Sequence, residues 1–307
     1  MARTKLCGIH KAMRHSSLRS WLLIKLPGTG WSAHCDMVRL GSVRCCASAP
    51  TTAMMYSLLH LGGFDGDLAF YRKHCRGAAR VLEFGAGDGR VGAELAADAE
   101  YVGVENCADF CTSARERLGE HGTVLEADML HPLPEGTEPF DTVVMAANTL
   151  FCTPDHEALL HRCSEALAPG GLLLFDVYNA APWHDEALGL EGEAEEGEPD
   201  EASDAEDDDL LVKAVDASGR EWNVYEREPA VDPSAQQIVC RYDFETASGE
   251  KHLTQVNVHH YSLPDELRAL LDTCGFEIEA TYGGFGEDPP PFDGEESEHL
   301  VFAARRR

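Results

Sequence analysis

Short apolar segments alternate with helix-like segments from residue 64 to residue 179. The apolar segments cover residues 81–84, 101–106, 123–128, 140–148 and 172–179. They are nearly continuous apolar runs, which is the pattern of strands that are buried on both faces. Strands that alternate with helices form a parallel sheet with a helix layer on each side. We therefore predict an α/β fold built on a doubly wound, mostly parallel sheet.

The pattern changes after the fifth predicted strand. Residues 185–209 contain 14 acidic residues, no basic residue and almost no large apolar side chain. Such a segment buries too little surface to offset the entropy of ordering, so we predict a disordered acidic loop, with an acidic recognition patch as the alternative. In residues 210–262 apolar side chains recur with a period of two, which predicts an inserted antiparallel β meander. A helix over 263–274 and strands over 276–283 and 299–305 complete the chain.

Residues 1–53 differ from the rest of the chain in charge. They contain eight of the 25 Lys and Arg residues and a single acidic residue, Asp36, and show no clear periodicity. This composition is typical of an organelle transit peptide. The alternative is a start codon assigned too far upstream, with Met54 or Met55 as the first residue. In both cases we expect residues 54–307 to form the folded domain.

The remainder of the chain is strongly acidic, with 17 Lys or Arg residues against 53 Asp or Glu residues after position 50. Such a body repels nucleic-acid phosphates and anionic membranes. No apolar stretch approaches the roughly 20 residues that a membrane helix needs. We therefore expect no membrane association and consider nucleic acid an unlikely partner.

The cysteines give no sign of a metal or a disulfide framework. There are 11 of them at irregular positions, and they fit no four-ligand zinc pattern. We expect no metal site, and reduced thiols in a soluble intracellular protein. Its compartment is the cytoplasm, or the plastid or mitochondrial matrix if residues 1–53 are a transit peptide.

A glycine-rich turn follows the first strand. The segment 81–90 reads VLEFGAGDGR, an acid followed by glycines at every second position. Glycines at a strand-to-helix turn let the backbone approach a ligand and point its amides at it. A dinucleotide fingerprint starting at Gly85 would need glycine where Arg90 stands, and a phosphate-binding loop would need a Gly-Lys pair. The spacing therefore disfavours nicotinamide and ATP sites.

In a parallel sheet, ligands bind at the carboxyl ends of the strands. The polar residues there are Glu83 to Gly89, Glu105, Asp128, Asn148, Asp176, Tyr178 and Asn179.

The pattern from Glu83 to Gly89 resembles the first motif of the class I S-adenosylmethionine-dependent methyltransferases. The segment ALAPGGLLLFDVYN, residues 166–179, resembles their L-x-P-G-G turn and fifth strand. The order of elements is similar to a small-molecule subfamily with an inserted meander. This resemblance implies a seven-stranded Rossmann-like sheet with an antiparallel terminal strand. It also implies S-adenosyl-L-methionine as cofactor and methyl transfer to a small-molecule acceptor by in-line displacement.

The resemblance also implies a set of cofactor-binding residues. Glu105 would hold the ribose hydroxyls, to which a carboxylate offers two acceptor atoms. Asp128 would accept from the adenine amine with Met129 beside the ring, unless Asp128 is a helix N-cap. Asn148 would lie near the methionine portion, unless it serves turn geometry. The full set of predicted cofactor-binding residues is Tyr56, Glu83, Gly85, Ala86, Gly87, Asp88, Gly89, Glu105, Asn106, Asp128, Met129 and Asn148. Tyr56 is in the set because an aromatic face suits a sulfonium; the alternative is that it packs on the core.

The transfer step itself needs positioning of the acceptor and exclusion of water more than a strong catalyst, because the leaving group is neutral. Tyr178, after the fifth strand, and His260, at the end of the meander, are the candidates to face the methyl group, with His259 beside them. The alternative is that the His pair marks a solvated strand end. Residues 148–151 read NTLF and lack the Pro-Pro pair that nucleic-acid methyltransferases of this broad family carry there. This departure favours a small neutral or cationic molecule, or a protein side chain, as acceptor.

Two functions from other classes compete with this interpretation. One is a non-catalytic S-adenosylmethionine-binding or assembly protein, and the other is a nicotinamide-dependent oxidoreductase on a similar sheet. The sequence sets no oligomeric state.

Overall fold

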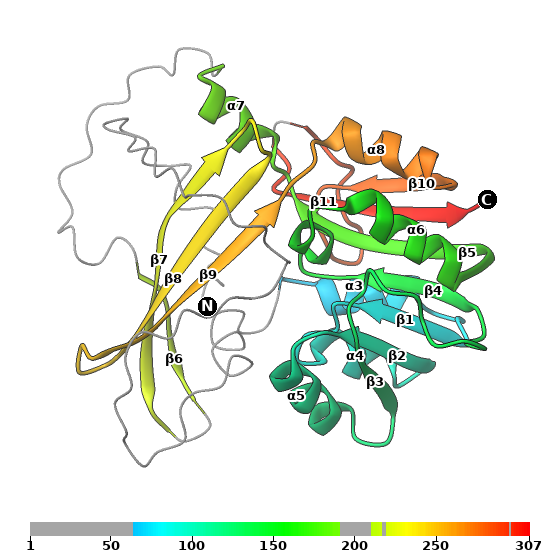
Figure 1. Cartoon of the computed structure of the whole chain (residues 1–307), viewed down its shortest axis with the longest axis horizontal. Coiled ribbons are helices and arrows are strands. Elements are labelled where there is room, and N and C mark those ends of the chain that lie inside the picture. The colour runs from blue at the N-terminus through cyan, green and yellow to red at the C-terminus, as the bar shows by residue number, and fades with distance from the viewer. Residues whose placement is uncertain (1–63, 191–209, 217–218, 295) are drawn as a thin grey trace.

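The computed structural model describes residues 64–190, 210–216, 219–294 and 296–307. It contains a seven-stranded sheet in the order β10-β11-β5-β4-β1-β2-β3 (Figure 1). Strands β1 to β5 pair in parallel, whereas β11 runs antiparallel to both of its neighbours. The predicted fold class, with its antiparallel terminal strand, is confirmed. The strands are β1 (Arg80–Phe84), β2 (Glu100–Glu105), β3 (Gly122–Glu126), β4 (Phe140–Met145), β5 (Leu167–Tyr178), β10 (Phe276–Tyr282) and β11 (His299–Arg306).

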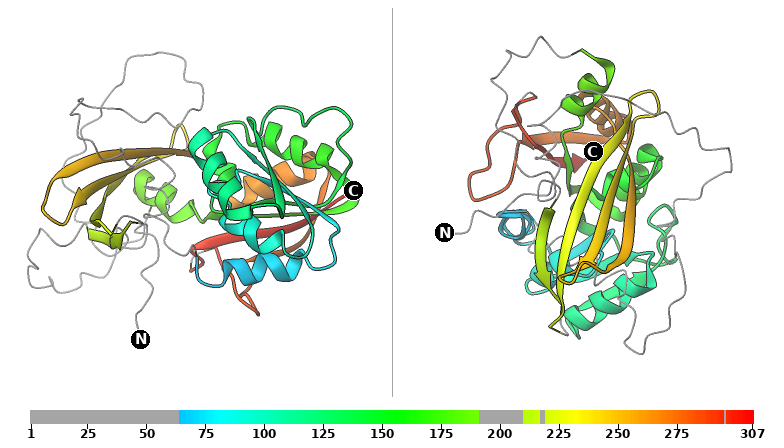
Figure 2. Two further views of the ribbon diagram at one scale, coloured as in Figure 1. Left: turned by 90° about the horizontal axis from the view of Figure 1, so that it is seen from below. Right: turned by 90° about the vertical axis from the view of Figure 1, so that its left-hand side faces the viewer.

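Helices cover both faces of this sheet (Figure 2). On one face α3, α4 and α5 bury side chains such as Phe70, Leu95 and Cys111. On the other face α6 and α8 bury Leu160 and Leu267, among others. Two hydrophobic cores thus explain why the strands read as continuous apolar runs. The helices are α3 (Asp67–His74), α4 (Arg90–Leu95), α5 (Ala108–Leu118), α6 (His156–Ala166), α7 (Ala181–Leu188) and α8 (Pro264–Thr273), with a 3-10 helix η1 (Thr149–Cys152).

A second, four-stranded antiparallel sheet is inserted between β5 and α8. Its order is β6-β7-β8-β9, and it extends away from the main sheet (Figure 1). Alternate side chains on its inner face, including Trp222, Cys240 and Phe244, are buried in the same core as Tyr178 of β5. The insert is therefore packed onto the carboxyl end of β5. Its strands are β6 (Leu210–Val215), β7 (Glu221–Asp232), β8 (Gln237–Thr246) and β9 (Lys251–His260).

The first residues of the segment predicted to be a disordered acidic loop, from residue 185, are helical instead. Residues 185–188 form the end of α7, which has a proline at its start and buries Trp183. Proline is favoured in the first helical turn, and burial of the indole ring anchors the helix. Residues 191–209 and the predicted N-terminal extension, residues 1–53, lie outside the described residues.

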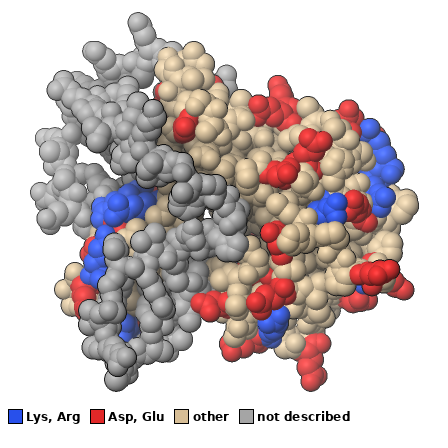
Figure 3. Space-filling model, viewed as in Figure 1, with Lys and Arg blue, Asp and Glu red and all other residues tan. Residues whose placement is uncertain are grey.

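Acidic side chains are scattered over the α/β part of the surface in Figure 3, which agrees with the acidic composition. In the part of the chain that the structure describes, no helix is long and apolar enough to cross a membrane.

Candidate functional site

The glycine turn connects β1 to α4 with three left-handed backbone positions. Gly85, Gly87 and Gly89 have φ angles of 70°, 55° and 79°. A Cβ atom on Gly85 would lie 2.6 Å from the side chain of Thr149, and one on Gly89 would lie 3.0 Å from Ala114. The first and third glycines are therefore required by packing as well as by conformation.

Gly87 differs from the other two glycines. A Cβ atom there would meet only the carbonyl oxygen of Gly85, at 4.0 Å. The neighbouring Ala86 is buried, and its amide donates to the carbonyl of Val104 at 3.1 Å. The middle of the turn at Gly87 thus has room for a ligand on its outer side.

Glu105, the last residue of β2, reaches back to this turn. Its Oε2 accepts from the Gly87 amide at 3.0 Å, and its Oε1 accepts from the Cys107 amide at 2.8 Å. Burial raises the pKa of its carboxyl, and the hydrogen bonds from the backbone amides lower this pKa in part. Each carboxylate oxygen has a second lone pair. Glu105 therefore both fixes the turn and keeps acceptor capacity for two adjacent hydroxyls.

Asp128 and Met129 follow β3 at the same edge of the sheet. Asp128 Oδ1 accepts from the amide of Leu130 at 2.9 Å. No helix follows, since residues 127–139 have none in the described structure, so Asp128 closes a local turn and caps no helix. Met129 is half-buried against the core, and Asn106 beside Glu105 is exposed. Tyr56 lies outside the described residues.

The backbone is strained where β4 ends. Ala147 and Asn148, neither of them glycine, have φ angles of 54° and 64°. The Ala147 amide donates to Asp176 Oδ1 at 2.9 Å, and Asn148 Oδ1 accepts from the Tyr178 amide at 2.7 Å. Consecutive left-handed residues of this kind cluster at binding and active sites. Asn148 thus serves the geometry of this turn, and the strain marks the β4 end as part of the candidate site.

Two of the predicted acids lie beneath or beside the turn with partners of their own. Glu83 is buried and accepts from the Tyr101 hydroxyl at 2.6 Å, and burial raises the pKa of its carboxyl to about 8. Asp88 accepts from the Arg90 amide at 3.2 Å and forms an ion pair with Arg117 at 2.8 Å. Their observed contacts are therefore to the protein, not to the open side of the turn.

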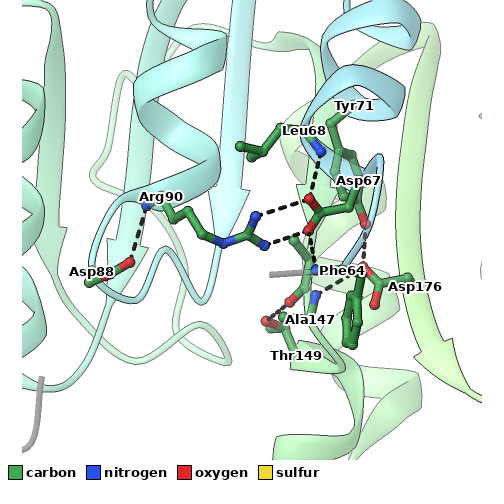
Figure 4. Close-up of polar contacts among 10 residues, drawn as sticks. Phe64, Asp67, Leu68, Tyr71, Asp88, Arg90, Ala147, Thr149 and Asp176 are labelled. Atoms are coloured by element: carbon green, nitrogen blue, oxygen red, sulfur yellow. Dashed lines mark hydrogen bonds and ion pairs between the residues drawn. The ribbon is translucent and has the colours of Figure 1, made fainter. Parts of the chain in front are cut away.

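Sequence reasoning missed a buried polar network behind the turn (Figure 4). Arg90 of α4 donates two hydrogen bonds to Asp67 of α3, at 3.0 and 2.5 Å. Tyr71, one helical turn after Asp67, donates to Asp176. Burial raises the pKa of the Asp176 carboxyl to about 6. The sequence identifies Asp176 only as a polar residue near a strand end, and nothing in it pairs Asp176 with Tyr71.

The two candidate residues for the transfer step do not lie together. The Tyr178 ring stacks on His259, with ring centroids 5.7 Å apart, and meets the edge of Phe151 at 5.1 Å. His260 instead contacts Gln237, with 3.3 Å between its Nδ1 and the Gln237 Nε2. Successive residues of a strand point to opposite faces. The structure therefore brings His259, not His260, to Tyr178.

Comparison with known proteins is consistent with this geometry. Residues 81–171 match a family model described as a methyltransferase domain. The trans-aconitate 2-methyltransferase of Variovorax paradoxus is 38% identical over 104 residues, which cover 33% of this chain and 39% of that protein. Its counterpart from Rhodopseudomonas palustris (strain BisA53) is 39% identical over 99 residues, covering 31% and 36%. The chain thus spans well under half the length of these curated relatives.

Solved structures share the fold over most of their length. The CcbJ methyltransferase from Streptomyces caelestis is 24% identical with a TM-score of 0.58, and the likeness covers 80% of this chain and 91% of that one. An S-adenosylmethionine-dependent methyltransferase from Clostridium acetobutylicum is 12% identical with a TM-score of 0.59, covering 83% and 97%. At these sequence identities the similarity shows a shared fold only.

Proposed function

We propose that this chain, whose fold and matched domain are those of the class I S-adenosylmethionine-dependent methyltransferases, moves a methyl group from S-adenosyl-L-methionine to a small-molecule acceptor by in-line displacement. The observation that carries the proposal is the bond from Gly87 to Glu105. It places a carboxylate with spare acceptor capacity beside the one glycine of the turn that has free space.

The donor site fits the residues at three strand ends. Glu105 binds the ribose hydroxyls, and Asp128 and Met129 border the adenine ring. The strained turn at Ala147 and Asn148 supports the methionine portion. S-adenosylmethionine supplies a methyl group on a positively charged sulfur, and a site rich in carboxyl groups favours such a cation.

The acceptor approaches from the side of the inserted sheet. Tyr178 is the residue of β5 that contacts both η1 and the insert, through Phe151 and His259. These side chains exclude water and orient the acceptor, which is the main requirement when the leaving group is neutral. A small-molecule acceptor agrees with the curated relatives, which are trans-aconitate 2-methyltransferases.

The test has two measurements on the same protein. The first is binding of S-adenosylhomocysteine by calorimetry, with NAD(H) as the comparison ligand. The second is transfer of labelled methyl groups from S-adenosylmethionine into a small-molecule filtrate of cell extract. We expect binding of the first ligand only, and incorporation into small molecules.

The outcomes separate the competing functions. Binding of NAD(H) without S-adenosylhomocysteine would identify an oxidoreductase. Binding of S-adenosylhomocysteine with no incorporation into the filtrate would identify a non-catalytic cofactor-binding protein. Incorporation into protein instead of the filtrate would overturn the small-molecule acceptor.

A further inference from the structure

Tyr178 and His259 contact each other between the two sheets, and each has a polar atom without a hydrogen-bond partner in the described part of the chain. Tyr178 stands at the end of β5 and His259 near the end of β9, and their rings stack. The Tyr178 hydroxyl and His259 Nδ1 are buried, and neither has a hydrogen-bond partner among the described residues. Buried polar atoms in folded proteins are nearly always paired, because an unpaired one costs free energy. A bound group that offers both a hydrogen-bond donor and an acceptor would pair these two atoms.

The two members of the pair are uncharged near neutral pH. Burial lowers the pKa of the His259 imidazole to about 4 and raises the pKa of the Tyr178 phenol. The titratable groups that act on Tyr178 are Cys240, Cys152 and Tyr261, and His260 acts on His259. Burial also lowers the pKa of His260 and raises the pKa of Tyr261 to about 12. A neutral imidazole and a phenol bind uncharged hydroxyl or amine groups better than carboxylates.

The 3-10 helix η1 lies between the glycine turn and Tyr178 and contacts both. Thr149, the first residue of η1, lies where a side chain on Gly85 would stand, and Phe151 packs on the Tyr178 ring. Asn148, just before η1, accepts from the Tyr178 amide. The strained end of β4 thus sets the position of Tyr178 relative to the proposed donor site.

We infer that the Tyr178 hydroxyl and His259 Nδ1 together form the polar contact of the acceptor site, and that they bind an uncharged hydroxyl-bearing part of the acceptor. This inference rests on the proposed function and adds the chemical class of the acceptor to it. It also sets this chain apart from the curated trans-aconitate 2-methyltransferases, because trans-aconitate is a polycarboxylate.

The test uses the full chain loaded with S-adenosylhomocysteine and two probes, cis-1,3-cyclohexanediol and trans-aconitate, with binding followed by ligand-observed NMR. We expect the diol to bind and trans-aconitate not to bind at this pair. The Tyr178→Phe and His259→Phe variants should each weaken diol binding about fivefold to tenfold, the loss of one hydrogen bond. Tyr225→Phe, a change to a half-buried tyrosine of β7, is the matched control and should leave diol binding unchanged.

A second readout separates a binding role from a structural one. Removing an unpaired buried hydroxyl relieves a cost, so Tyr178→Phe should leave the melting temperature of the free protein unchanged or raise it by about 2–4 °C. A fall in melting temperature would mean that the hydroxyl has a structural partner such as an ordered water, and would overturn the inference.

The remaining outcomes are also decisive. Equal diol binding by wild type and both variants, no diol binding to the wild type, or preferential binding of trans-aconitate would each overturn the inference. Failure of the wild type to bind S-adenosylhomocysteine would instead count against the proposed function.

Discussion

Arg90 binds Asp67 through both of its terminal nitrogens and joins the helix after the glycine turn to the helix before β1 (Figure 4). Asp67 is almost fully buried, and it also accepts from the amide of Leu68 at 2.7 Å. The arginine that excludes a dinucleotide fingerprint at this position therefore has a structural role. It fixes the start of α4 against α3, and so fixes the end of the glycine turn that leads into α4.

Removing the guanidinium should strongly destabilise the fold. Arg90→Met leaves the buried Asp67 carboxylate without its ion-pair partner, at a cost of about 3–5 kcal/mol. The double variant with Asp67→Asn should recover more than half of this loss, because the uncompensated charge is gone. Urea unfolding followed by circular dichroism measures both. If the losses simply add, the two residues are not coupled and the structural role assigned to Arg90 is wrong.

Glu105→Gln should weaken the donor site while keeping the shape of the side chain. It removes the negative charge and one of the acceptor atoms near Gly87, so we expect at least about a tenfold loss of affinity for S-adenosylhomocysteine. Glu126→Gln, at the exposed end of the neighbouring β3, is the control and should bind normally. Calorimetry measures the affinity of the wild type and both variants for S-adenosylhomocysteine. An unchanged affinity in Glu105→Gln would exclude a direct role of Glu105 in binding.

The first and second glycines of the turn should respond differently to alanine. Gly85→Ala adds a clash with Thr149 to the cost of a left-handed backbone, and should destabilise the protein by about 3 kcal/mol. Gly87→Ala meets no close atom and should cost only about 1–2 kcal/mol. It should nevertheless reduce cofactor binding, because its methyl group enters the space assigned to the ligand. Thermal unfolding and calorimetry together distinguish the two; similar stabilities would contradict this account of Gly85.

Glu83 should make the protein less stable as pH rises. The pKa of its carboxyl is about 8 in the folded chain and 4.5 as an ordinary glutamate, so between these values the folded state holds a proton that the unfolded chain has lost. Its contribution to stability is therefore complete at low pH and is lost as pH rises toward 8. Asp176 acts in the same direction between 3.8 and about 6.

Glu83→Gln is the matching variant, because an amide still accepts from the Tyr101 hydroxyl but does not ionise. Urea midpoints measured at about pH 5 and about pH 8 should differ less in the variant than in the wild type. An equal decline in both proteins would show that another group causes the pH dependence.

The sheet could be predicted from the sequence because each strand has its own signal. Continuous apolar runs and glycine turns are local features, and together they are sufficient to predict β1 to β5. Period-two alternation likewise predicted the inserted sheet. The helix around Trp183 was not predicted, because its last residues, 185–188, belong to the strongly acidic segment 185–209 that the composition indicates to be a loop.

Contacts between distant residues could not be predicted in the same way. Tyr71 and Asp176 are 105 positions apart, and their contact depends on how α3 packs against β5. Which of His259 and His260 lies against Tyr178 could not be predicted for a related reason. A shift of one residue moves a side chain to the other face of a strand, and adjacent histidines give no signal of which one faces the core.

Strands β6 to β9 form a sheet of their own, which in the sequence lies between β5 and α8. Every described residue assigned to the donor lies outside this insert, whereas His259 lies within it. On the proposed assignment, the donor-binding residues and one of the two acceptor contacts therefore lie in separate parts of the chain. If these roles are right, exchanging the insert between relatives will change the range of acceptors and leave the affinity for the methyl donor unchanged.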